Sequence, residues 1–182
     1  MPSFPCGTIE IQGKGGIILY QIGEFIVKAA NGVCEVKDLV HLDFSDTDSK
    51  KLYYLLVPAT DQAGKIYMPA TGSATVRKVM TKQEAMAFIR KIPSVNEAWI
   101  DNEKTRERSY KEAITSNDPE RLVGIIKLIC DRKEERIRQG RKVTAVDERY
   151  FKLAENLLYA ELEVALDKDK EEIHRLIQEQ CG

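Results

Sequence analysis

The sequence predicts an α+β protein in which a small antiparallel β domain, residues 17–80, precedes an all-α helical bundle, residues 81–182. Two patterns predict this division. Short apolar segments separated by turn residues fill the first part, with no helical period between them. From Thr81 on, apolar residues recur every three or four positions. Several short strands of this kind are typical of a small antiparallel barrel, which we expect here.

Residues 1–16 are expected to form a poorly ordered tail, because they contain two prolines and four glycines without a sustained apolar period. Lys14, Gly15 and Gly16 can be encoded by a ribosome-binding sequence, which suggests the hypothesis that natural translation begins near Leu19. A basic start followed by an apolar segment is missing, so we expect no signal peptide.

The first two predicted strands flank a strong turn. Ile22–Val27 is the first strand, with Gly23 near its start. Asn31-Gly32 then favours a hairpin turn. The apolar residues of the second strand are Val33, Val36 and Leu39.

Three further strands are predicted after the polar segment Asp43–Lys51, which is expected to be a hairpin loop. Proline cannot donate to a ladder, so Pro69 should end the fourth strand. These strands are Leu52–Val57, Lys65–Met68 and Val76–Met80.

Polar caps place the helices of the second part. Thr81 with Glu84 fits a capping box, and Pro93 should stop that helix. A second helix is expected over Asn102–Thr115. The three that follow should open at Asp118 with Pro119, at Thr144 with Asp147, and at Asp169.

The net charge of −1 excludes a uniformly basic protein, but the charge is segregated along the chain. Cations gather before Lys142, whereas the segment after Leu153 is acidic. Such a face would attract phosphates. It is equally explained as a solvated helix surface with pairs such as Glu134–Arg138. The candidate phosphate contacts in this region are Lys127, Arg132, Lys133 and Arg136.

Trp99 is the single tryptophan and lies between the Pro93 break and a basic helix. It can be interpreted as a buried plug between the two domains. It can also be interpreted as an apolar wedge for a DNA base step.

No catalytic or metal-binding pattern is found. His41 and His174 have no partner at metal-ligand spacing, and the scattered cysteines form no CxxC pair. We therefore expect no enzyme activity, no cofactor and no small-molecule substrate. No segment is apolar for long enough to span a bilayer. Together with unpaired thiols, this favours a cytoplasmic protein that has no membrane association.

The order of several motifs resembles the CarD/CdnL family of bacterial transcription regulators. Tyr20–Val27 and Asn31–Val36 are similar to the two opening strands of that family. The other similar segments are Tyr53–Pro58, Ile66–Pro69, Val76–Val79, Arg106–Glu112, Ser116–Asp118 and Ala154–Leu162.

The resemblance implies a Tudor-like module that binds the β subunit of RNA polymerase, and a helical domain that touches promoter DNA at the edge of the transcription bubble. It places the polymerase contact on Lys65, Ile66, Tyr67, Met68 and Pro69. Together with the charge pattern, it makes Trp99, Arg106, Lys127, Arg132, Lys133 and Arg136 the candidate DNA contacts.

Two positions depart from the family. Its members carry a tryptophan wedge where this chain has Arg106, and an arginine where it has Tyr67. A second hypothesis therefore stays open: a non-catalytic adaptor whose barrel binds another protein and whose helices dimerise without touching DNA.

Overall fold

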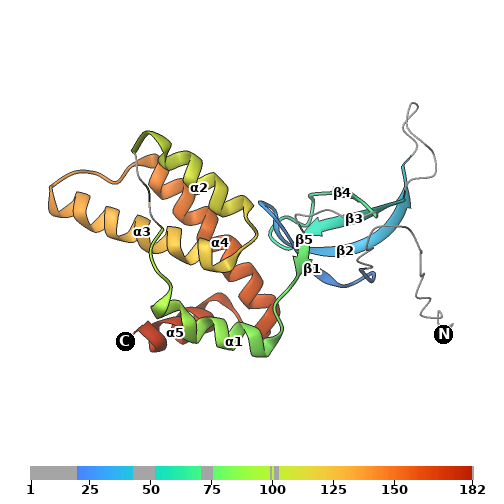
Figure 1. Cartoon of the computed structure of the whole chain (residues 1–182). Coiled ribbons are helices and arrows are strands. Elements are labelled where there is room, and N and C mark those ends of the chain that lie inside the picture. The colour runs from blue at the N-terminus through green and yellow to red at the C-terminus, as the bar shows by residue number, and fades with distance from the viewer. Residues whose placement is uncertain (1–19, 43–51, 71–75, 99, 101–102, 182) are drawn as a thin grey trace.

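A computed structural model describes residues 20–42, 52–70, 76–98, 100 and 103–181. The chain is an α+β protein with an N-terminal antiparallel sheet followed by helices, as predicted (Figure 1). The expected tail 1–16 and the expected hairpin loop 43–51 lie outside the described residues.

The five strands of the sheet are arranged in the order β4-β3-β2-β1-β5. Each neighbouring pair is antiparallel, and the ladder between β2 and β3 has an irregularity between Val36 and Asp38. β4 and β5 form the two edges. The strands are β1 (Phe25–Lys28), β2 (Gly32–His41), β3 (Leu52–Pro58), β4 (Ile66–Pro69) and β5 (Val76–Lys78).

The first strand starts later in the structure than the sequence predicted. Ile22 and Gly23 lie in a turn, where Gly23 has φ = 88° and its N–H donates to the Val36 carbonyl over 2.7 Å. Glycine reaches this left-handed conformation without the Cβ clash of other residues. The chain therefore turns at Gly23, and β1 starts at Phe25.

The two faces of the sheet are covered to different extents. One face forms its own core, which contains Ile26, Val36, Leu56 and Met68 among others. On the opposite face, Val27 and Val33 pack against Ala160 of the helical domain.

The helices confirm the predicted caps. Thr81 and Glu84 form a complete capping box, Asp118 caps a helix with Pro119 at its start, and Thr144 accepts the Asp147 N–H. The helices are α1 (Lys82–Lys91), α2 (Arg106–Thr115), α3 (Pro119–Arg138), α4 (Ala145–Leu166) and α5 (Lys170–Cys181).

The second helix is shorter than expected. A 3₁₀ turn, η2, covers Glu103–Thr105, and the α-helix begins only at Arg106. Thr105, which precedes α2, makes no capping bond through its side chain, and the expected first residue, Asn102, lies outside the described residues.

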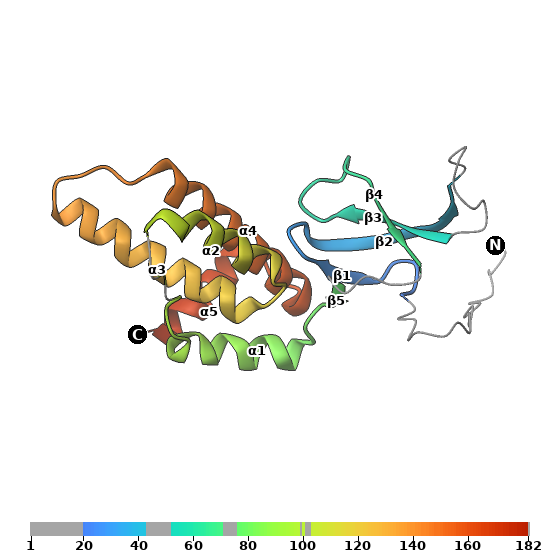
Figure 2. The same ribbon diagram turned by 45° about the horizontal axis from the view of Figure 1, so that its top comes forward.

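α4 is the central helix of the second domain. It contacts α1, α2, α3 and α5, and it also touches β2. Figure 2 shows α1 and α5 side by side beneath the other helices, with the sheet at one end of the bundle. None of the described helices is long and apolar enough to span a bilayer.

Candidate functional site

β4 offers an exposed strand edge. It is the outermost strand on its side of the sheet among the described residues. Met68 points into the sheet core and is 2% exposed, whereas Tyr67 on the opposite face is 45% exposed. The predicted contact segment therefore presents Lys65, Tyr67 and Pro69 to solvent and keeps Met68 as a core residue.

The ladder fixes which backbone groups of β4 point outward. The Ala70 N–H donates to the Leu52 carbonyl over 2.8 Å, and the following pairs are Tyr53 with Pro69 and Leu55 with Tyr67. Bonded and non-bonded pairs alternate along an antiparallel ladder. The N–H and C=O of Tyr67 therefore point away from β3, as does the C=O of Pro69.

An apolar surface adjoins Tyr67 on the same face of the sheet. Leu55 is its direct partner on β3, and Tyr53 and Val57 lie on either side of Leu55, all three partly exposed. Phe25 of β1, which is 37% exposed, lies on the same face but is separated from Val57 by the charged Glu35 of β2. The edge and this apolar face together can accept an extended segment of another protein.

The candidate DNA-binding cations on the helices each contact other groups within the chain. Arg106 of α2 and Arg132 of α3 flank the buried carboxylate of Asp147, at Nε–Oδ distances of 3.5 and 3.7 Å. The fully buried Tyr110 hydroxyl donates to the same carboxylate over 3.0 Å. Burial, then the charge of Asp147, raises the pKa of Tyr110, so its hydroxyl stays protonated.

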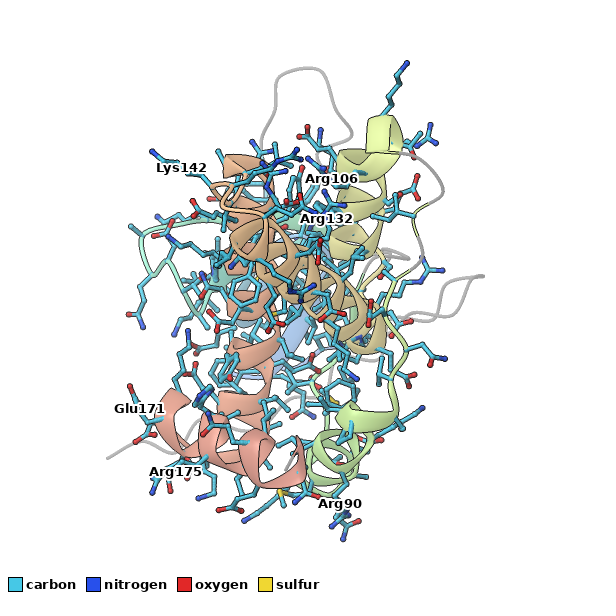
Figure 3. The ribbon with its side chains drawn as sticks, turned by 90° about the vertical axis from the view of Figure 1, so that its left-hand side faces the viewer. Arg90, Arg106, Arg132, Lys142, Glu171 and Arg175 are labelled. Carbon is cyan, nitrogen blue, oxygen red and sulfur yellow. The ribbon has the colours of Figure 1, made fainter. Side chains whose placement is uncertain are left out.

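Arg106 and Arg132 are therefore not simple surface cations. Their side chains are only 16% and 24% exposed, because α2, α3 and α4 converge on Asp147. Figure 3 shows the two arginines beside each other at the end of the bundle that also carries Lys142. Their charge serves first to compensate a buried acid.

The other three candidates on α3 also have intramolecular contacts. The Lys127 ammonium donates to the carbonyls of Pro93 and Val95 over 3.0 and 2.7 Å. Lys133 lies 3.8 Å above the centre of the Phe151 ring. Arg136 donates from Nε to the Lys142 carbonyl over 2.8 Å and so holds the turn between α3 and α4.

The exposed cations of this region lie in that turn and just before it. Arg138, Arg141 and Lys142 are exposed, and Gly140 with φ = 67° reverses the chain between them. Arg138 pairs with Glu135 and not with the expected Glu134, because three residues along a helix bring side chains together as four do. We call Arg138, Arg141 and Lys142 the cationic turn.

Two buried acids, Asp147 and Glu161, have roles that were not predicted from the sequence. Asp147 was interpreted only as part of a helix start, yet it is fully buried between two arginines. Glu161 lies in the helix period of α4 beside Ala160 and Leu162, and that apolar setting was the available indication of burial. Trp99 lies outside the described residues.

No metal centre is formed by the part of the chain that the structure describes. The Nδ1 of His174 on α5 lies 3.0 Å from the Tyr159 hydroxyl, within hydrogen-bond distance. Cys34 and Cys130 are unpaired thiols, and burial raises the pKa of Cys34 to about 11.

Comparison of this chain with protein-family models and with curated proteins finds no match.

Proposed function

We propose that the protein is a bacterial transcription regulator of the CarD/CdnL type, which binds the RNA polymerase β subunit through the β4 edge and promoter DNA through its helical domain. The observation that carries the proposal is the exposed, aromatic edge strand, because it lies on the segment for which the family resemblance implies the polymerase contact. The expectation of no catalysis belongs to this proposal and rests on the sequence.

The proposal includes a Tudor-like closure of the sheet. Met68 of β4 and Val76 of β5 belong to the two opposite edge strands, yet both side chains join the same buried cluster. A flat sheet would keep its edges far apart, so this shared core supports a strongly curled one.

The first test concerns pairing of a polymerase strand with the β4 edge. Tyr67 offers an outward N–H and C=O, and its exposed ring can anchor a partner. Tyr67→Ala should weaken binding of the polymerase β subunit through loss of the ring. Tyr67→Pro should weaken it further, because proline also removes the outward donor. The measurement is the affinity for the purified β subunit by calorimetry.

Tyr67→Pro, compared with Tyr67→Ala, tests the outward donor selectively, because the Tyr67 backbone N–H makes no hydrogen bond to β3 and its loss leaves the ladder intact. Proline is tolerated at outward positions of edge strands. Leu153→Ala, at a partly exposed apolar side chain of α4, is the control for loss of surface apolar area. If both Tyr67 variants fold and bind the β subunit as the wild type does, the edge is not the contact.

The cationic turn supplies the second test. Exposed cations contribute phosphate contacts that weaken as salt rises. Replacing Arg138, Arg141 and Lys142 together by glutamine should weaken promoter binding and reduce its dependence on salt. Arg132 is left in place, since its loss would disturb the Asp147 cluster.

Three exposed cations elsewhere give a matched control for charge. Lys82, Arg90 and Arg175 lie on α1 and α5, and Figure 3 shows Arg90 and Arg175 at the opposite end of the bundle from Lys142. Their replacement by glutamine removes the same charge from a different surface. Equal effects of the two triple variants on DNA binding would leave only a general effect of net charge.

The adaptor hypothesis has its own support. Lys127, Lys133 and Arg136 have contacts within the chain, and Arg106 and Arg132 balance Asp147, so those cations are explained without DNA. Capture from a bacterial lysate with the intact chain separates the two functions. The proposed regulator retains the polymerase β subunit and DNA, whereas an adaptor retains another protein and no DNA.

A further inference from the structure

A buried ion pair joins the sheet to the helical domain. Arg77 of β5 donates from its two terminal nitrogens to the two carboxylate oxygens of Glu161 on α4, at 2.5 and 2.6 Å. Glu161 is 2% exposed and Arg77 is 29% exposed. A bidentate pair of this kind fixes direction as well as distance, because both groups are planar.

Backbone groups complete the bonding of both partners. The Met80 N–H donates to Glu161 over 3.2 Å, and Arg77 donates from Nε to the Asn117 carbonyl over 2.8 Å. The Asn117 side chain in turn donates to the Val27 carbonyl of β1 over 3.2 Å. The network therefore ties two strands to the loop between α2 and α3 and to α4.

Close packing surrounds this network. A Cβ added to Gly32 of β2 would lie 2.8 Å from the Cδ2 methyl of Leu157 on α4, so this side chain packs directly against the strand at Gly32. Val27 and Val33 meet Ala160 on the same side. Only residues 79–81 connect β5 to α1, and Met80 within that link is bonded to Glu161.

We infer that Arg77 and Glu161 are positioning residues that hold the sheet and the helical domain at one fixed angle, so that the molecule presents the β4 edge and the cationic turn as a single rigid unit. Apolar contacts alone permit sliding, whereas the paired planes of the guanidinium and the carboxylate accept few orientations. The functional consequence rests on the proposed function. A fixed distance between the β4 edge and the cationic turn sets the effective concentration of DNA at that turn when the protein is bound to polymerase.

The test is ¹⁵N relaxation of the full-length chain. Wild-type sheet and helix amides should report one rotational correlation time. Arg77→Met keeps the unbranched stem of the side chain and removes the guanidinium group. In this variant the common correlation time should be lost, and sheet amides should tumble faster than helix amides. Residual dipolar couplings should show a loss of the single interdomain orientation.

Lys78→Met is the matched control, because Lys78 is the neighbouring cation on β5, is exposed, and pairs only at the surface with Glu24 at 3.3 Å. It should keep the common correlation time. If Arg77→Met does not fold, Glu161→Gln decides, since it keeps the size of the side chain and removes its charge. The inference is overturned if a folded Arg77→Met or Glu161→Gln keeps one rotational correlation time and an unchanged interdomain orientation. It is also overturned if sheet and helix amides have two different correlation times in the wild type or in Lys78→Met.

Binding measurements keep this inference separate from the proposed function. The Arg77→Met chain should bind isolated β subunit and isolated DNA as the wild type does, but lose affinity for DNA when polymerase is already bound. A chain that tumbles as one body yet binds no polymerase would refute the proposed function alone.

Discussion

Asp147 is the acid on which three helices converge. Arg106 and Arg132 share this buried carboxylate as a partner, and removing one member of a buried ion pair is strongly destabilising. We expect Asp147→Asn to lower the free energy of unfolding by about 3 kcal/mol. Urea unfolding measures this change. Glu148→Gln, on the exposed neighbour, is the control and should be nearly neutral; similar losses in both variants would contradict a special role of Asp147.

Cys34 is a residue-scale probe of pH. Burial raises the pKa of its thiol from 9.0 to about 11, so the folded protein keeps this proton more tightly than the unfolded chain. The resulting stability is complete below pH 9 and is lost as pH rises from about 9 to 11. Unfolding measured across this range should show a decline that Cys34→Ala reduces. A decline of equal size in Cys34→Ala would assign it to other groups.

At the scale of single elements, the N-terminus of α1 depends on Thr81. Its hydroxyl oxygen accepts the Glu84 N–H, and the Glu84 carboxylate accepts the Thr81 N–H. Loss of an N-cap leaves orphan backbone donors, so Thr81→Ala should cost about 1 kcal/mol of stability. Thermal melting checks this value, with Thr81→Ser as the variant that keeps the cap. If the serine variant loses as much stability as the alanine variant, the cap bond is not responsible.

The caps could be predicted because they are local. Thr81, Asp118 and Thr144 each bond to a backbone group two or three residues away, within reach of a sequence pattern. The clusters could not be predicted in this way. Tyr110 and Asp147 are separated by 37 positions, and Arg77 and Glu161 by 84, so only the packing of the helices and sheet brings them together.

The candidate site was predicted unevenly for the same reason. The contact segment around Tyr67 was placed by the family resemblance, and the local pattern of Pro69 predicted only where that strand ends. The contacts of Arg106, Arg132 and Lys133 come from other helices, so their charges looked free in the sequence. The turn at Gly23 was missed because the apolar Ile22 resembled a strand residue, although it is 66% exposed.

At the scale of the whole molecule, the joint between the domains predicts cooperative unfolding. Single small domains usually unfold in one transition, and the bonded interface between the sheet and the helices should extend this cooperativity to both domains. Far-UV circular dichroism follows the helices, and alkylation of the buried Cys34, located by mass spectrometry, follows the sheet. Both should change at the same urea concentration in the wild type. Two separate midpoints would show that the domains are thermodynamically independent.

The β4 edge also bears on self-association of the protein. An open strand edge can recruit identical chains one after another into extended aggregates. Here the edge strand is only four residues long, and Pro69 leaves Tyr67 as the residue within β4 that offers an outward donor. One outward N–H is enough to fix the register of a single partner strand, but it is a weak template for repeated addition of identical chains. The same short strand can therefore pair with one specific partner strand and still be a poor template for fibril growth.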